Sequence, residues 1–205
     1  MKRTVDLFAT ENETAIRKLT DMNAIESTAK GVAEFLHSCP LLERKVISYY
    51  ISHPSRSAIL QEYIKLTSYA GYSLPEAFRL FTERFHFLHC YGEAWQTSMQ
   101  VFCTLFAEEN QNFSVEMIYP LCYSMFLLDL DFKNFMIKNK MSKREFIKNC
   151  RGHEAISQLS AEYLGDVYDF ILLRGLRTIP ESSINETMIS RVALLNEHET
   201  KIVNI

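Results

Sequence analysis

The stretch KNKMSKREFIKNCRG, residues 138–152, combines a helix start with apolar residues at helical spacing. Glu145 follows Ser142 by three residues, which is a capping box: the two side chains satisfy free backbone amides of the first helical turn. The same signature begins at Ser73 and at Ser183. The stretch therefore predicts a helix that starts after Ser142, and its recurrence favours helices elsewhere in the chain.

Working outward, apolar residues recur at helical intervals along most of the chain, and no convincing run alternates with period two. Only six glycines and five prolines interrupt the pattern. The clearest apolar faces are Phe78, Phe81 and Phe85; Trp95, Met99, Phe102 and Phe106; and Leu164, Val167, Tyr168 and Ile171. We therefore predict an all-α protein of about ten helices.

Composition limits the possible functions. A chain of 205 residues with 47% hydrophobic residues can form one domain, which we expect to span residues 1–177. We expect the protein to be a monomer. Residues 178–205 are expected to form a tail with one amphipathic helix. A net charge of -3 argues against nucleic acid as the main partner. No apolar run approaches the ~18 residues that span a bilayer, and the five cysteines form no CxxC pair, so a cytoplasmic location is expected.

Sequence motifs for covalent catalysis or for phosphate binding by a glycine-rich loop do not occur. His86, His89 and Cys90 offer three possible metal ligands on one helix face, but a fourth is not obvious, so no metal and no cofactor are expected.

Glu93 lies among aromatic residues, directly after Gly92 and before an alanine. It is either a solvated charge at a helix start or a functional carboxylate.

Several ordered motifs resemble one family. Residues 138–152 resemble the KMT-x-x-E-F/Y-I-x-x-N-R-G signature of Sec7 domains, the catalytic modules of guanine-nucleotide exchange factors for Arf GTPases. Residues 159–168 resemble the family's LP-x-E-x-L-x-x-L/I-Y segment, and residues 32–36 resemble its VA-x-FL pattern. The resemblance covers roughly residues 12 to 175. It implies a right-handed helical superhelix with a hydrophobic groove that receives the switch regions of Arf.

The family's first catalytic motif, FRLPGEAQKID, resembles the segment that contains Gly92-Glu93-Ala94. The resemblance implies that Glu93 enters the nucleotide site, repels the β-phosphate and displaces Mg²⁺, without covalent chemistry, so the protein is a GTPase regulator and not an enzyme. This chain carries a net insertion of three residues before Gly92. The apolar spacing of the following helix fits the family better with Tyr91 at the finger position, and both alignments stay open.

The family's second motif, AYS-x-x-ML-N/T-TDLH-N/S, resembles residues 122–134. Lys133 replaces its histidine, a change expected at the lip of the groove. Pro120 falls where the family helix is continuous. The helix therefore either begins near Tyr119, with Pro120 in its first turn, or is kinked at a cost of about 3 kcal/mol, and we expect the late start. The residues that the resemblance assigns to the Arf groove are Tyr119, Tyr123, Ser124, Leu127, Asp129, Asp131, Asn134 and Met141.

The Tyr-Ser pair and the later Asp of this motif resemble the large Golgi-type factors that brefeldin A traps with Arf-GDP. The sequence thus favours an exchange factor that acts in vesicle trafficking, peripheral to Golgi membranes and recruited through partners or flanking domains. One alternative is a degenerate domain that binds Arf or other partners as a scaffold without exchange. Another is a helical interaction domain with a misleading resemblance.

Overall fold

The structure, a computed structural model, describes residues 7–8, 11–85, 94–110 and 113–177. These residues form nine α-helices and two short 3₁₀ helices, with no strand among them, which confirms the all-α prediction. In chain order the helices are α2 (Asn12–Asp21), α3 (Ala29–Ser38), α4 (Arg44–Ile51), η1 (Pro54–Arg56), α5 (Ser57–Lys65), α6 (Leu74–Arg84), α7 (Ala94–Glu109), α8 (Val115–Lys133), α9 (Lys143–Gly152), η3 (Glu154–Ile156) and α10 (Ala161–Arg174).

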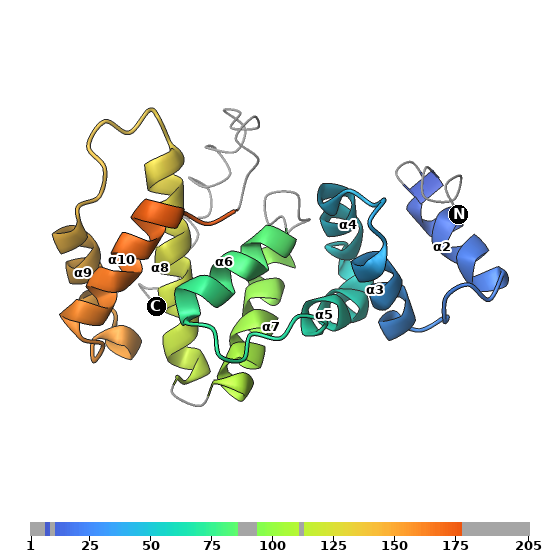
Figure 1. Cartoon of the computed structure of the whole chain (residues 1–205), viewed down its shortest axis with the longest axis horizontal. Helices are drawn as coiled ribbons and strands as arrows, with labels where there is room; N and C mark the ends of the chain where they lie inside the picture. The colour runs from blue at the N-terminus through green and yellow to red at the C-terminus, as the bar shows by residue number, and fades with distance from the viewer. Residues whose placement is uncertain (1–6, 9–10, 86–93, 111–112, 178–205) are drawn as a thin grey trace.

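The helices form an elongated body, in which α2 lies at one end, α9 at the other, and α6 and α7 between them (Figure 1). The tail predicted for residues 178–205, with its amphipathic helix and its Ser183 capping box, lies outside the described residues.

The predicted capping boxes at Ser73 and Ser142 are both present. The carboxylate of Glu145 accepts hydrogen bonds from the backbone N–H of Ser142 at 2.9 Å and from its hydroxyl at 2.6 Å. These hydrogen bonds lower the pKa of Glu145, since they favour its charged form. The sequence signature thus fixes where α6 and α9 begin.

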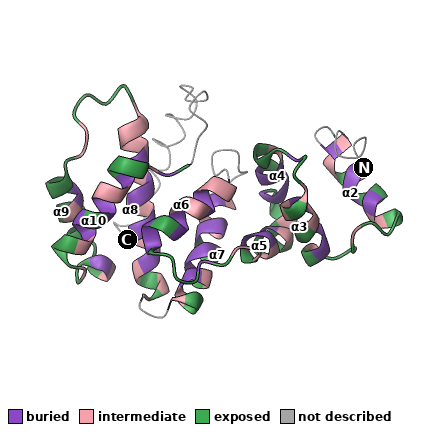
Figure 2. Cartoon of the chain, in the orientation of Figure 1, coloured by how far each residue is buried: buried purple, intermediate pink, exposed green. Residues whose placement is uncertain are grey.

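Aromatic side chains fill the centre of the body, where purple marks buried residues along the inner faces of α6 and α7 (Figure 2). Phe81 of α6 stacks on Phe102 of α7 with ring centroids 4.7 Å apart. Phe78 packs against the same ring at 5.6 Å, and the ring of Tyr69 meets it edge-on at 4.9 Å. The apolar faces predicted from helical spacing therefore form the core, and they fix α6 against α7.

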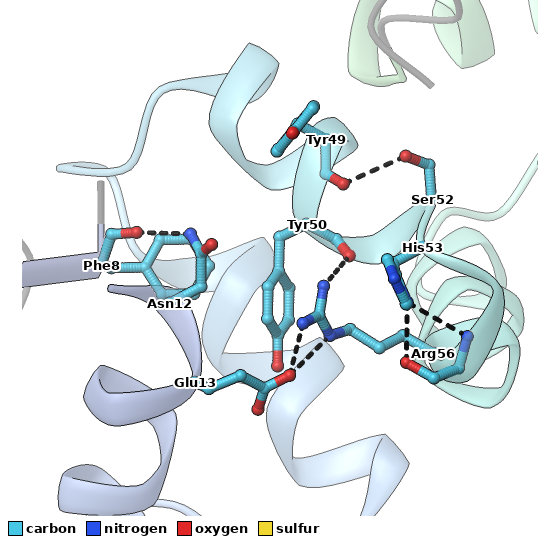
Figure 3. A network of polar contacts seen from close by, with 9 residues as sticks. Phe8, Asn12, Glu13, Tyr49, Tyr50, Ser52, His53 and Arg56 are labelled. Carbon is cyan, nitrogen blue, oxygen red and sulfur yellow. Dashed lines mark hydrogen bonds and ion pairs between the residues drawn. The ribbon is translucent and has the colours of Figure 1, made fainter. Parts of the chain in front are cut away.

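A polar contact ties the first helix to this body (Figure 3). Arg56 donates from Nε to the carboxylate of Glu13 in α2 at 2.9 Å and from another guanidinium nitrogen to the carbonyl of Tyr50 at 2.8 Å. Its guanidinium also lies 4.0 Å from the centre of the Tyr50 ring. Phe8 packs edge-on against the other side of this region, 5.1 Å from the Tyr50 ring. One arginine thus joins three segments.

The predicted start of α8 near Tyr119 is wrong. The helix begins at Val115, and Pro120 lies inside it as the sixth residue. Proline lacks an N–H, so the carbonyl four residues earlier, at the exposed Glu116, loses its helical donor. Because that carbonyl lies in the first, solvent-facing turn, water can replace the donor, and the helix continues through the proline.

Candidate functional site

One face of α8 is left partly open. Tyr119, Tyr123, Leu127, Asp131 and Asn134 follow one another at intervals of four or three residues, and all five are half-buried. Such intervals place side chains on the same face of a helix. We call these five residues the α8 stripe. The buried residues of the helix are Ile118, Leu121, Cys122, Met125, Phe126, Leu128 and Asp129.

The start of α7 is fixed beside this stripe. Ala94 is the first residue of α7, and the indole of the next residue, Trp95, stacks on the ring of Tyr123 with centroids 6.1 Å apart and an interplanar angle of 28°. Trp95 is 9% exposed, so this contact is part of the packing between α7 and α8. Glu93 and Tyr91, the two candidates for the finger position, lie outside the described residues. In sequence, Glu93 directly precedes the helix whose first turn rests on the stripe.

The far end of the stripe is joined to the chain that leads into α9. The carboxylate of Asp131 accepts a hydrogen bond from the backbone N–H of Met141 at 2.9 Å. Tyr168 of α10 donates its hydroxyl to the carbonyl of Met141, also at 2.9 Å. The ammonium of Lys140 donates to the backbone carbonyls of Asp131 and Asn134. Three predicted groove residues, Asp131, Asn134 and Met141, therefore lie together at the end of α8.

Ser124 is half-buried beside the stripe, three residues before Leu127. Its hydroxyl donates to the carbonyl of Pro120 at 2.8 Å within α8, and the hydroxyl also interacts with the thiol of Cys150 on α9. Burial raises the pKa of Cys150, and the interaction with Ser124 opposes this shift. Ser124 thus contributes to the contact between α8 and α9.

Asp129 has a different role from the one predicted. It is 1% exposed, and its carboxylate accepts hydrogen bonds from Lys133 Nζ and from the backbone N–H of Leu176, both at 2.7 Å. Lys133 also donates to the carbonyl of Leu176. A carboxylate that is buried and bonded in this way cannot contact a partner protein in this conformation. Asp129 and Lys133, expected at the groove, instead hold the segment that follows α10.

Gly175 explains how that segment approaches α8 so closely. Its backbone has a φ of 59°, a region that side chains rarely allow, and a Cβ there would lie 3.2 Å from Asp129 Oδ1. Its carbonyl accepts a hydrogen bond from Arg79 of α6 at 3.0 Å. Residues 175–177 thus connect α6, α8 and α10. No sequence signal pointed to this contact, because its members lie more than forty residues apart.

Potential metal ligands do not gather in threes in the part of the chain that the structure describes. The His86, His89 and Cys90 cluster lies outside that part. No described helix is both long and apolar enough to span a bilayer.

A family model for the Sec7 domain matches residues 1–175. The chain belongs to the Sec7 family. Its similarity to solved structures supports the same fold: the Sec7p catalytic domain has a TM-score of 0.76 and 21% identity, covering 85% of this chain and 97% of that one. A Sec7 domain bound to ARF1-GDP with brefeldin A has a TM-score of 0.75 and 21% identity, covering 84% of this chain and 90% of that one.

Two relatives of this Sec7 domain illustrate its similarity to known proteins. F-box only protein 8 of Mus musculus is 30% identical over 174 residues, which cover 82% of this chain and 53% of that protein. Brefeldin A-inhibited guanine nucleotide-exchange protein 1 of Arabidopsis thaliana is 28% identical over 189 residues, which cover 89% of this chain and 11% of that protein. The chain thus spans about half or less of the length of these relatives.

Proposed function

We propose that this Sec7 domain promotes GDP release from an Arf-family GTPase. The α8 stripe receives the switch regions of the GTPase, and Glu93 enters its nucleotide site. The observation that carries this proposal is the stacking of Trp95 on Tyr123, because it holds the start of α7, directly after Gly92-Glu93, against the stripe. The solved complex of a Sec7 domain with ARF1-GDP supports the choice of partner, since it has the same fold.

The chemistry assigned to Glu93 is electrostatic. A carboxylate near the β-phosphate competes for the Mg²⁺ that neutralises the phosphate and repels the phosphate oxygens. Loss of the metal weakens GDP binding, so the nucleotide leaves. No covalent bond forms or breaks, and the protein acts as a GTPase regulator with no cofactor of its own.

The test is release of labelled GDP from a purified Arf GTPase in the presence of the 205-residue chain. We expect faster release with the wild-type chain and loss of acceleration with Leu127→Ser, because Leu127 lies in the middle of the stripe and its apolar surface is only half-buried. The matched control is Leu41→Ser, since Leu41 is 58% exposed in the segment between α3 and α4 and belongs to no part of the proposed interface. Equal acceleration of GDP release by both variants would show that the α8 stripe does not bind the GTPase.

A second candidate is a scaffold that binds an Arf GTPase without releasing its nucleotide. One observation favours it: the insertion of three residues before Gly92, which changes the segment that carries the proposed glutamate. If the chain binds the GTPase in a separate binding measurement but does not accelerate GDP release, this alternative is established and exchange is excluded.

Brefeldin A provides a separate prediction. The Tyr123-Ser124 pair and Asp131 match the pattern of the factors that the drug traps, and relatives of this chain are named for inhibition by it. We expect the drug to slow the GDP release that the wild-type chain stimulates. An unchanged release rate at saturating drug would show that this chain is resistant. In this proposed role the protein acts as a monomer, peripheral to Golgi membranes, in vesicle trafficking.

A further inference from the structure

Three consecutive apolar side chains are exposed to solvent directly after α8. Phe135 is 72% exposed, Met136 69% and Ile137 37%. Single exposed apolar residues are common on protein surfaces, but this run is the longest of its kind among the described residues. We call residues 135–137 the apolar tip.

The apolar tip is held in place at its base. Lys140 binds the carbonyls of Asp131 and Asn134, and the N–H of Met141 binds the Asp131 carboxylate. Within the loop, the side chain of Asn134 accepts a hydrogen bond from the N–H of Met136 at 3.0 Å. Both ends of the loop are therefore fixed to the end of α8, and this arrangement holds the apolar side chains in solvent.

The helix that follows the tip has a basic outer face. Arg144, Lys148 and Arg151 are spaced by four and three residues, on the side of α9 opposite the buried Phe146 and Cys150. All three are exposed, and no ion pair joins them to a carboxylate in the described part of the chain. The nearby Glu145 is held in its capping box at the start of the helix. Lys148 also helps to lower the pKa of Glu145, but all three basic side chains are exposed and can meet an external anion.

Charge along the chain is unevenly distributed. Residues 134–152 contain six Lys or Arg and one Glu, which gives a formal charge of +5. The whole chain carries -3, so the remaining residues carry -8. Figure 1 shows α9 and the loop that leads to it at the end of the molecule opposite α2. An acidic surface would therefore attract this end of the molecule and repel the rest, which fixes an orientation.

We propose that the apolar tip and the basic face of α9 together form a contact surface for membranes that contain anionic lipids. Phe135 and Met136 enter the headgroup region, while Arg144, Lys148 and Arg151 bind the lipid phosphates and carboxylates. An exposed apolar group beside several basic residues is the combination that favours a peripheral position on a bilayer. This surface goes beyond the proposed function and does not depend on it. It differs from the sequence-based expectation that the chain reaches membranes only through partners or flanking domains.

The test is sedimentation of the 205-residue chain with vesicles of phosphatidylcholine that contain phosphatidylserine, compared with pure phosphatidylcholine vesicles. We expect binding to the first kind and much weaker binding to the second. The double variant Phe135→Ser, Met136→Ser should bind more weakly by a factor of at least about ten, since two apolar side chains no longer leave water. Met22→Ser is the matched control, because Met22 is 72% exposed at the opposite end of the molecule and should bind like the wild type.

The basic face is tested separately by the double variant Arg144→Glu, Lys148→Glu. Each basic residue near an anionic bilayer strengthens binding about fivefold, so we expect a loss greater than about tenfold on vesicles with phosphatidylserine. Raising the salt concentration should weaken binding of the wild-type chain in the same assay.

Two results would overturn the proposal. One is equal sedimentation of the wild-type chain with both kinds of vesicle. The other is a tip variant that binds vesicles normally but binds a soluble Arf GTPase more weakly, which would assign residues 135–137 to the protein interface. Circular dichroism of each variant shows whether it is folded, so loss of binding is interpreted only for folded protein.

Discussion

Replacing Glu93 by lysine is expected to reduce the GDP release stimulated by this domain by a factor on the order of 100, the usual effect of removing one well-placed electrostatic group. Lysine is expected to have the larger effect than alanine, because its ammonium attracts the phosphates that the carboxylate repels. Binding of the GTPase is expected to persist, since the α8 stripe and the contact between Trp95 and Tyr123 are unchanged. The measurement is release of labelled GDP, with binding followed separately.

Tyr91→Ala is the matched control. The family motif places Glu93 at the finger position, whereas the apolar spacing of the following helix places Tyr91 there. If the motif alignment holds, Tyr91→Ala retains most of the activity and Glu93→Lys loses it. The reverse result would assign the finger position to Tyr91 and leave the carboxylate as a solvated charge at the start of α7. Loss of GTPase binding in both variants would mean that the insertion is itself part of the interface.

Replacing Asp129 by alanine is expected to lower the free energy of unfolding by about 1 to 3 kcal/mol, the usual cost of leaving a buried hydrogen-bonding group without its partner, since the side chain of Lys133 is 29% exposed and can be hydrated. The variant leaves the N–H of Leu176 without its acceptor and Lys133 without its carboxylate. Both groups lie where α8 meets the segment after α10, so the loss should loosen that segment. The measurement is denaturant unfolding followed by circular dichroism.

Asp166→Ala provides the comparison for this variant, since Asp166 is an exposed aspartate on α10 and its removal should change stability by less than about 0.5 kcal/mol. Asp129→Asn should fall between the two, because an amide oxygen can still accept from Leu176 while the charge that balances Lys133 is gone. A change of less than about 1 kcal/mol for Asp129→Ala would contradict the stabilising role assigned to this carboxylate.

Local features of the sequence were sufficient to predict that the fold is built from helices. The capping boxes at Ser73 and Ser142 and the apolar spacing of α6 and α7 involve residues within two or three turns of one another. Such contacts depend on the backbone of one helix only, and so they can be predicted from the order of residues. The start of α8 was predicted less well, because the strength of a proline as a helix breaker depends on which carbonyl it deprives of a donor.

The candidate site could be predicted only in part. The family resemblance selected Tyr119, Tyr123 and Leu127, which the structure places on one half-open face of α8. The same resemblance selected Asp129, although two residues along a helix change the direction of a side chain by about 200°. Whether that direction meets solvent or another helix depends on what packs there.

The sequence by itself thus determined the all-α class, the positions of two capping boxes and the family. Only the tertiary structure decided that Asp129 is internal, that Trp95 rests on Tyr123, and that the apolar tip stands in solvent beside a basic helix face. The physical reason is the range of the interactions. Helix formation is governed by neighbours a few residues apart, whereas burial and the meeting of charges are set by segments that are distant along the chain.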